Sequence, residues 1–392
     1  MKRNHAVSRL ELGPFDEARV IATAKSARAE LDAEVSLGLV FVTADFAPQL
    51  AEFLELVRVY ARVSTLVGCS GAGLIGTRVE AENKPGFSLL LLSLPATELT
   101  IFPFSQAQVE ESSGPAYWHM ESGVESADAW IVLAHPARLE VDRWLREWDV
   151  AYPGIPTIGG LASGGQAVEE IFLLHDGGQL TDADGLAIAL RGGLRVATIV
   201  SQGCRPIGEP LTITSARQHL VLTLASKPAY QVLNGVFLSL NERERIRAQG
   251  NLFAGLAVSE YLEEFRRGDF LIRNILGADP STGAVAIGAV PRMGQTMQYQ
   301  LRDRDTADED LRELGVAAHD DDLVRPFATL LFSCNGRGRG LFQIPDHDAG
   351  VLAEIFGPGA LAGFFCNGEI GPIGAKNFLH GYTASAALLC DA

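Results

Sequence analysis

Residues 361–383 read L-A-G-F-F-C-N-G-E-I-G-P-I-G-A-K-N-F-L-H-G-Y-T and predict a buried strand that runs into a glycine-rich turn. The apolar run 361–366 ends abruptly at Asn367-Gly368-Glu369, and a second apolar run, 377–389, returns across the same core. So many glycines beside polar side chains are typical of main chain that passes close to something small. A tight turn with satisfied polar residues is the alternative. The groups here that can do chemistry are Cys366, Asn367, Glu369, Lys376, Asn377, His380 and Tyr382.

The composition indicates a globular chain with a negative surface. The 392 residues predict two to three domains or two large α/β halves, and 47% hydrophobic content is sufficient for sizeable cores. The formal net charge of −16 repels phosphate backbones and anionic headgroups. We therefore expect neither nucleic acid nor a membrane surface as partner, whereas a cationic or zwitterionic small molecule is compatible.

Cysteine usage and the N-terminus favour a soluble, cytoplasmic protein. The five cysteines are scattered and form no C-x-x-C pair, which fits reduced thiols better than a disulfide framework. The basic residues near Met1 are not followed by an apolar segment, as they would be in a signal peptide, and no apolar run approaches the length of a membrane span.

Hydrophobic periodicity predicts an α/β (mixed α+β) protein. Helices are expected at residues 16–34 and 229–240, and another starting from a capping box at Thr306, while 106–128 reads as a loop. Three strands at 170–175, 185–190 and 194–201 are joined by short glycine turns, an antiparallel meander. A purely parallel sheet is disfavoured. We expect two related halves with mixed, largely antiparallel sheets flanked by helices.

One pattern recurs four times: a helix leads into a strand that ends in a glycine-bearing turn. It suggests an internal duplication, with two such units in each half. Because strand ends are where α/β proteins usually bind ligands, we expect these turns to meet around a shared site. The turns are Gly68-Cys69-Ser70, Gly159-Gly160, Ser333-Cys334-Asn335-Gly336 and Cys366-Asn367-Gly368.

A dinucleotide-binding pattern directly follows the first of these turns. Gly71, Gly73 and Gly76 match G-x-G-x-x-G, but that fingerprint needs a helix directly after it. The sequel 77–86 reads as a short β-like run and a turn, which favours a glycine-lined turn over a nucleotide site.

Several of these segments resemble the FIST family, a sensory module with N- and C-terminal halves. The closing motifs C-N-G-E-I-G-P (366–372) and N-F-L-H-G-Y-T-A-S (377–385) are similar to its terminal signature. Shorter similarities lie at 67–70, 158–162, 203–208, 269–274 and 332–337. The resemblance implies a helical lead-in at 1–34, a FIST N-like domain at 35–225 and a FIST C-like domain at 226–392. It also implies a non-catalytic sensor of small ligands such as amino acids, although no recognisable output module is present.

The leading hypothesis is a small-molecule, possibly amino-acid, sensing site in a signal-transduction pathway. Arg337 could bind a ligand carboxylate bidentately, and Glu369 could bind its ammonium group. The alternative is that these two side chains simply pair with each other. The predicted ligand-binding residues are Cys69, Ser70, Asn335, Arg337, Cys366, Asn367, Glu369, Asn377 and His380.

Two other functions stay open. A cysteine-dependent enzyme would use Cys366 or Cys334 as nucleophile and His380 as base. An adaptor would bind a signalling protein, for which the acidic region 303–322 is the candidate surface, as eukaryotic relatives of the family carry an F-box.

No cofactor and no metal site are expected, because no paired Cys/His spacing occurs. His347 lies between Asp346 and Asp348, which we expect to cap a helix rather than to bind metal.

Overall fold

The computed structural model describes residues 3–165, 167–176, 178–180, 182–262 and 264–392. About 29% helix and 40% strand, in mixed sheets with helices, confirm the predicted α/β class. The chain divides into two compact units. One unit is Met1–Val200 with Leu311–Ala392, and the other is Ser201–Asp310. These units differ from the predicted ranges 1–34, 35–225 and 226–392, because the second unit is inserted within the sequence of the first.

Within the described residues, the first unit forms three six-stranded sheets that share one topology. In each sheet the two central strands are parallel, and the strands that flank this pair are antiparallel to it. The first sheet has the order β1 (His5–Leu12), β6 (Gly86–Ser93), β2 (Leu37–Val42), β3 (Leu66–Ser70), β10 (Leu173–His175), β11 (Gly178–Leu180). The second has the order β24 (Lys376–His380), β23 (Glu369–Ile373), β9 (Thr157–Leu161), β8 (Ala129–Ala134), β12 (Gly185–Arg191), β7 (Glu98–Phe104). The third has the order β13 (Leu194–Ser201), β25 (Ala384–Asp391), β21 (Pro326–Cys334), β22 (Ala360–Cys366), β4 (Gly73–Gly76), β5 (Val79–Glu82).

The chain passes three times through the same series of elements. Each repeat has a first strand (β1, β7 or β13), a parallel pair, a hairpin, and a last strand (β6, β12 or β25) that returns beside the pair. The third repeat contains the 201–310 unit between β13 and β21. The expected repetition is therefore present, but it is threefold and not a duplication of halves.

The hairpin of each repeat joins the sheet of another repeat. The hairpin β4–β5 pairs with β22, the hairpin β10–β11 pairs with β3, and the hairpin β23–β24 pairs with β9. Each sheet is thus completed by strands from two repeats, so the three repeats are locked into one unit.

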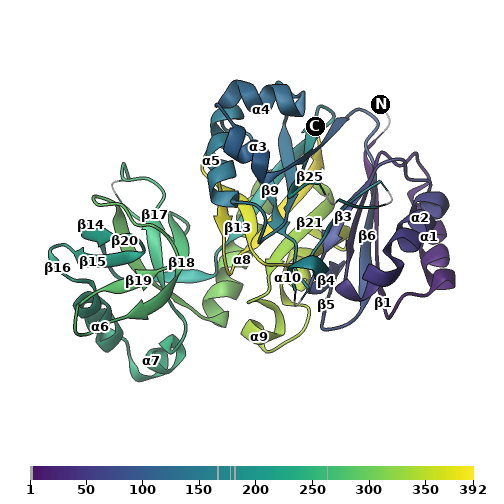
Figure 1. The fold of residues 1–392 in the computed structure, drawn as a ribbon. Helices are drawn as coiled ribbons and strands as arrows, with labels where there is room; N and C mark the ends of the chain where they lie inside the picture. Colours follow the sequence, from purple (N-terminus) through teal and green to yellow (C-terminus); the bar gives the residue numbers. More distant parts are fainter. Residues whose placement is uncertain (1–2, 166, 177, 181, 263) are drawn as a thin grey trace. The chain divides into compact units, whose positions relative to one another are not determined.

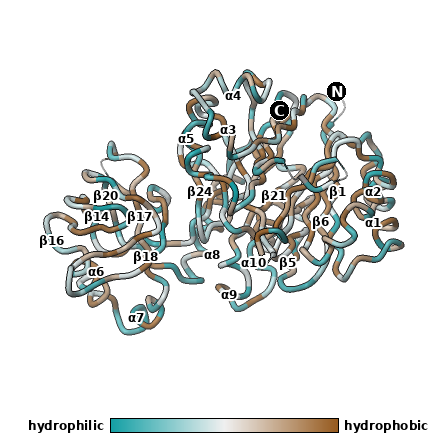
Figure 2. The backbone as a smooth tube through the Cα atoms, in the orientation of Figure 1, coloured by the Kyte–Doolittle hydropathy of each residue, from teal (hydrophilic) through white to brown (hydrophobic). Residues whose placement is uncertain are grey.

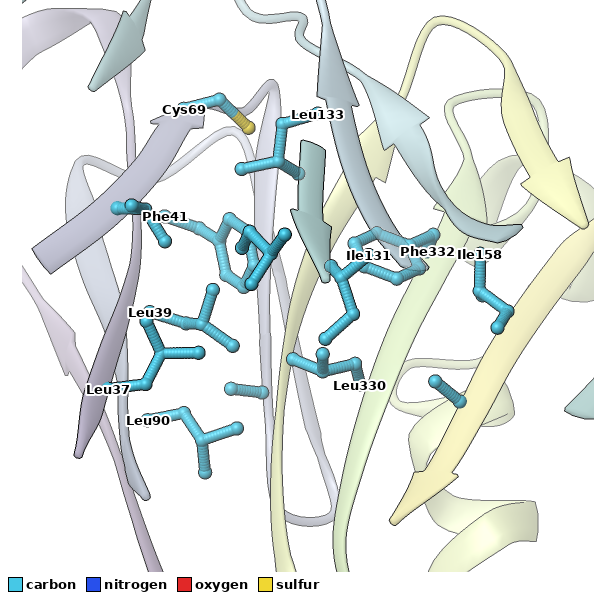
Figure 3. Close-up of a cluster of buried hydrophobic side chains, with 14 of the residues drawn as sticks. Leu37, Leu39, Phe41, Cys69, Leu90, Ile131, Leu133, Ile158, Leu330 and Phe332 are labelled. Carbon is cyan, nitrogen blue, oxygen red and sulfur yellow. The ribbon is translucent and has the colours of Figure 1, made fainter. Parts of the chain in front are cut away.

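Successive side chains of a strand point to opposite faces of its sheet, so the three sheets share one central core and each has an outer layer under its helices. Leu37, Leu39 and Phe41 point toward side chains of the other two sheets, while Val40 and Val42 pack under helices. Figure 3 shows this meeting of the sheets, with Leu39 and Phe41 on one side and the second and third sheets opposite. In Figure 2 the chain is hydrophobic along inner strands such as β6 and β21.

Helices cover the outer face of each sheet. The first sheet carries α1 (Glu17–Leu31) and α2 (Leu50–Ala61) on the side away from the other sheets, as Figure 1 shows. The second repeat has α3 (Gln106–Glu111), α4 (Pro115–Ser122) and α5 (Val141–Ala151), and the third has α8 (Arg304–Asp320), α9 (Gly338–Phe342) and α10 (His347–Phe356). Short 3₁₀ turns lie at Ala44–Gln49 and Val168–Glu170.

The second unit is an antiparallel barrel around its own core. Among the described residues of this unit, six strands pair in a closed ring, because β14 hydrogen-bonds to both β20 and β15. The buried side chains inside include Ile213, Val285 and Leu301. The strands are β14 (Cys204–Arg217), β20 (Thr296–Arg302), β17 (Leu252–Ala257), β18 (Phe270–Ala278), β19 (Val285–Ile287) and β15 (Leu220–Leu224), with β16 (Lys227–Pro228), α6 (Ala229–Ser239) and α7 (Glu242–Ala248) outside the ring.

Three local predictions were wrong. The strands predicted at 170–175, 185–190 and 194–201 do not form an antiparallel meander, because β10, β12 and β13 belong to three different sheets. Residues 106–128 contain α3 and α4, and α3 starts from a capping box at Ser105. Helix α8 begins at Arg304, before Thr306, and the Thr306 N–H donates to Asp303 Oδ1 at 2.9 Å. Of the helices in the described part of the chain, none combines the length and apolar character needed to cross a bilayer.

Candidate functional site

The second strand of each parallel pair contains a glycine that lets the two strands approach closely. Gly68, Gly159 and Gly363 pair in register with Val40, Val132 and Leu331. A Cβ on these glycines would lie 1.7, 1.8 and 1.8 Å from the carbonyl oxygen of the paired residue. Only glycine fits at such a position. A second glycine follows five residues later in every case: Gly73 begins β4, and Gly164 and Gly368 lie in the turns after β9 and β22.

The turns after these strands are joined by main-chain hydrogen bonds. The Ser163 N–H, in the turn after β9, donates to the Ser70 carbonyl at 3.1 Å. The Asn367 N–H, in the turn after β22, donates to the Leu161 carbonyl at 3.1 Å. The first turn is therefore tied to the second, and the second to the third.

The Ser163 hydroxyl connects the third turn back to the first. It donates to the Phe365 carbonyl and accepts the Ala72 N–H at 2.9 Å. These contacts connect the ends of all three parallel pairs through the end of β9 and the turn after it, and we call this connected set of strand ends the strand-end ring. The predicted convergence of the glycine turns is what the structure shows.

Two predicted side chains lie exposed on the strand-end ring. Asn335 Nδ2 donates to Asn367 Oδ1 at 2.7 Å, and both residues are exposed. The main chain of Asn335 is fixed because its N–H donates to the Cys366 carbonyl at 3.0 Å. The two amides thus form a rigidly supported polar pair on a surface lined by glycine backbone.

Strained backbone lies next to this amide pair. Tyr382 adopts a φ of 63°, a left-handed backbone conformation that is unusual for a residue with a bulky side chain. Strained conformations of this kind cluster at functional sites. Its neighbour Thr383 donates its N–H to Glu369 Oε2 at 3.1 Å and accepts the Cys334 N–H at 2.9 Å. Glu369 is fully buried directly beneath the turn that was predicted to present it.

The structure places Arg337 in a buried ion pair with Asp348, a residue that sequence reasoning had assigned as a helix cap. Arg337 Nε and Nη2 donate to the two Asp348 oxygens at 2.7 and 2.8 Å, and both side chains have no exposed surface. Ser333 and His347 also contact the Asp348 carboxylate, at 2.8 and 2.9 Å. Arg337 is therefore not accessible to solvent. Its guanidinium binds the Asp348 carboxylate and not, as predicted, the carboxylate of a ligand. The prediction that Asp348 caps a helix is also wrong, because its carboxylate binds Arg337.

Two buried carboxyl groups in this cluster have pKa values that are shifted in opposite directions. Burial raises the pKa of Asp348, but the charge and hydrogen bonds of Arg337, helped by His347, outweigh burial and hold that pKa below its usual value. Glu80, whose Oε1 accepts the Ala349 N–H at 2.8 Å, has a pKa raised from 4.5 to about 8 by burial and by the charge of Asp348.

Glu80→Gln should change how stability depends on pH. Between pH 4.5 and about 8 the unfolded chain loses the Glu80 proton while the folded protein keeps it, so the unfolding free energy of the wild type falls as pH rises. The slope approaches about 1.4 kcal/mol per pH unit from this group alone. Glutamine keeps the hydrogen bond and cannot ionise. Urea unfolding across this range should give a flatter profile for the variant, and parallel profiles would refute the assignment.

Asn377 and His380 hold the β23–β24 hairpin in place. Asn377 Nδ2 donates to Asp149 Oδ1 at 2.7 Å and to the Ile155 carbonyl at 3.0 Å, while its Oδ1 accepts the Thr157 N–H at 2.8 Å. His380 Nε2 contacts the Gly371 carbonyl at 3.0 Å. Both side chains are buried, so the structure gives them supporting contacts and does not place them in the exposed amide pair.

Cys69 and Ser70 are likewise buried. The Ser70 hydroxyl accepts the Phe172 N–H at 3.1 Å. Burial raises the pKa of Cys69, and burial together with the nearby Glu369, Cys69 and Cys334 raises the pKa of Cys366. A thiolate is thus disfavoured at both sulfurs. Of the five cysteines, all of which are described, Cys334 alone is partly exposed.

Two further expectations can be compared with the geometry. Gly73–Gly76 forms strand β4, so no helix follows the G-x-G-x-x-G pattern to hold a pyrophosphate. Within the ranges that the structure describes, no group of three or more His, Cys, Asp or Glu side chains is arranged to hold a metal ion.

Comparisons with known proteins confirm the resemblance seen in the sequence. Residues 36–227 match the model of the FIST N domain, and residues 229–372 match that of the FIST C domain. Uncharacterized protein Rv0628c of Mycobacterium tuberculosis (strain ATCC 25618 / H37Rv) is 36% identical over 343 residues, covering 88% of each chain. Uncharacterized protein Mb0898c of Mycobacterium bovis is 36% identical over 372 residues, covering 95% of each chain.

A likeness to a solved structure is much weaker. The crystal structure of a cyanuric acid hydrolase from A. caulinodans aligns over 98% of this chain and 99% of that chain, with 11% identity and a TM-score of 0.30. A TM-score this low carries no argument about function. FIST domains are associated with sensing in signal transduction. On the matches to both domain models and the identity to full-length relatives, the chain belongs to the FIST family.

Proposed function

We propose that the protein senses a small molecule at the exposed face of the strand-end ring. The observation that supports this most is the Asn335–Asn367 pair, whose 2.7 Å hydrogen bond joins two exposed side chains on main chain that the ring fixes. Each amide has more donors and acceptors than this one bond uses. A preorganised pair of neutral amides suits a small polar ligand, because little conformational entropy is lost on binding.

An amino acid or a related metabolite is the ligand class we propose. Because Arg337 is committed to Asp348, the ligand carboxylate would instead be bound by the Asn335 and Asn367 amides and by main-chain N–H groups of the glycine turns. Partly exposed Cys334 would contact the ligand from the neighbouring strand end. The association of FIST domains with sensing supports this non-catalytic role.

The ring offers a route by which binding could affect a partner protein. Asn367 is hydrogen-bonded to the turn after β9, and Ser163 links that turn to the other two. A ligand on the amide pair would therefore favour one arrangement of all three repeats. A signalling protein that binds this ligand-bound arrangement more tightly than the ligand-free one would transmit the signal.

Thermal unfolding with a library of amino acids and related metabolites tests the proposal. A compound at a hundred times its dissociation constant should stabilise the wild type by about 2.7 kcal/mol. Asn335→Ala/Asn367→Ala should lose that stabilisation, whereas Asn234→Ala, an exposed asparagine in α6, should keep it. A compound that stabilises the double variant as much as the wild type would exclude the amide pair as its site.

A further inference from the structure

A pocket of about 380 Å³ opens in the first unit between the start of α5 and strand β24. Five of its nine lining side chains are apolar, among them Leu161 and Leu379. These two leucines also pack on the turn after β22, since a Cβ on Gly368 would lie 3.0 and 3.1 Å from their Cδ1 atoms. The pocket thus has an apolar floor next to the strand-end ring, although none of its lining residues belongs to the amide pair.

The walls of the pocket are fixed to each other at their far end. Asp149 on α5 accepts hydrogen bonds from the side chain and the main-chain N–H of Asn377 on β24, the shortest at 2.7 Å. A pocket with walls clamped in this way is largely preformed, as small-molecule sites usually are.

Four charged side chains line the rim of the pocket. One of the two arginines among them, Arg143, already lies close to carboxylates of the protein. Arg143 lies 3.7 Å from Glu140 and 3.6 Å from Glu147, and it donates to the Val109 carbonyl at 3.2 Å. Arg146 is exposed, and among the described residues no carboxylate lies within ion-pair distance of it. The other rim carboxylate belongs to Asp142. Arg146 is therefore the rim group best placed to bind an anion.

The threefold repeat shows what fills the corresponding position elsewhere in the molecule. In the third sheet, Ile75 pairs with Gly363 on one side and with Glu80 on the other. In the second sheet, Ile370 pairs with Gly159 and with Leu379. Because Gly363 and Gly159 are equivalent, Leu379 occupies the position that Glu80 has in the other sheet.

Glu80 brings a carboxyl group to the first turn of a helix. Its Oε1 accepts the N–H of Ala349, the third residue of α10, and α10 corresponds to α5 because each connects the two strands of a parallel pair. A carboxylate at a helix N-terminus is electrostatically favourable. At α5 the equivalent side chain is an apolar leucine, and an open pocket lies beside it.

We propose that this pocket binds a small organic anion, a carboxylate with an apolar body, whose carboxylate lies at the position that the Glu80 carboxyl group occupies in the third sheet. Arg146 holds the carboxylate at the rim, and the apolar body rests on Leu161 and Leu379. The site is separate from the proposed sensing site and does not depend on it.

Three probes with the same apolar body test the chemistry: hexanoate, 1-hexanol and hexylamine, titrated into the full chain and followed by saturation-transfer NMR. Hexanoate should bind at least tenfold more tightly than hexanol, and hexylamine should bind more weakly still. Hexylamine binding as tightly as hexanoate, or no binding by any probe, would overturn the proposal.

Two variants and one control locate the site. Arg146→Gln should weaken hexanoate about tenfold without changing hexanol, whereas Arg312→Gln, an exposed arginine on α8, should change neither. Leu379→Glu supplies an internal carboxyl group like that of Glu80 and should abolish hexanoate binding while the protein stays folded by circular dichroism. Unchanged hexanoate binding in both Arg146→Gln and folded Leu379→Glu would exclude this pocket.

Discussion

Arg337→Met should destabilise the protein by about 3–5 kcal/mol, the largest loss expected from removing one charge. The substitution keeps the length of the side chain but removes the guanidinium that donates at 2.7 and 2.8 Å to Asp348. Asp348, which has no exposed surface, would then lose its permanent counter-charge and keep its contacts with Ser333 and His347. The contact between the guanidinium and the Phe342 ring, 5.2 Å from its centroid, would be lost as well. Urea unfolding measures the effect.

An exposed pair on neighbouring elements provides the matched control. Arg312 and Glu354 are 2.8 Å apart with 43% and 58% of their side chains exposed, so Arg312→Met should cost less than about 1 kcal/mol. Arg337→Met/Asp348→Leu should recover part of the loss, because no buried charge remains unpaired. If Arg337→Met lowered the unfolding free energy no more than Arg312→Met does, the buried Arg337–Asp348 ion pair would not have the stabilising role described.

Gly363→Ala should cost about 3 kcal/mol or more, because the new Cβ would lie 1.8 Å from the Leu331 carbonyl oxygen. That oxygen belongs to the main chain of the paired strand and cannot rotate away, so β21 and β22 must separate. The central core, to which both strands contribute Leu330, Phe332 and Phe364, would open with them. The loss should appear as a lower urea midpoint or, if it exceeds the total stability, as failure to fold.

Gly350→Ala is the matched control for this prediction. Gly350 lies inside α10 and a Cβ there would meet nothing within 4 Å, so alanine should stabilise the helix by up to about 1 kcal/mol. Opposite signs for the two substitutions are expected. A Gly363→Ala protein as stable as the wild type would show that the parallel pair is not as closely spaced as described.

The elements of the fold that the sequence predicted are those with local signals. Apolar runs that end in glycine correctly marked β3, β9 and β22, and the closing stretch forms β22 and β25 as expected. Strand β1 was missed because it is an edge strand, paired on one side only, and just one of its side chains is fully buried. Helices α3 and α4 were missed because their short sequences lack a clear apolar stripe.

The threefold architecture depends on contacts that sequence periodicity does not report. Gly68, Gly159 and Gly363 carry a detectable signal, each with a second glycine five residues later. The repeats are nevertheless unequally spaced, since 201–310 is inserted in the third. The exchange of hairpins between sheets has no local signature at all.

The convergence of the strand-end turns was predicted from the sequence, but the contacts of the side chains there were not. Convergence of the turns was predicted from the recurring pattern of a strand that ends in a glycine turn, although these strand ends belong to three different sheets. The partner of Arg337 was not predicted, because Asp348 follows a histidine at a helix start, where a carboxylate usually caps. The surroundings of Asp348 include Ser333, which hydrogen-bonds to it, and Glu80, whose pKa it raises, and both come from strands outside that helix.

Hydrogen–deuterium exchange with and without a stabilising metabolite from the thermal screen tests the central claim, that the ends of the three parallel pairs form one ligand-responsive site. The strand-end ring predicts that peptides covering 68–73, 160–165, 334–337 and 366–369 gain protection together on binding. Protection confined to one of these turns, or found only elsewhere in the chain, would contradict a shared site.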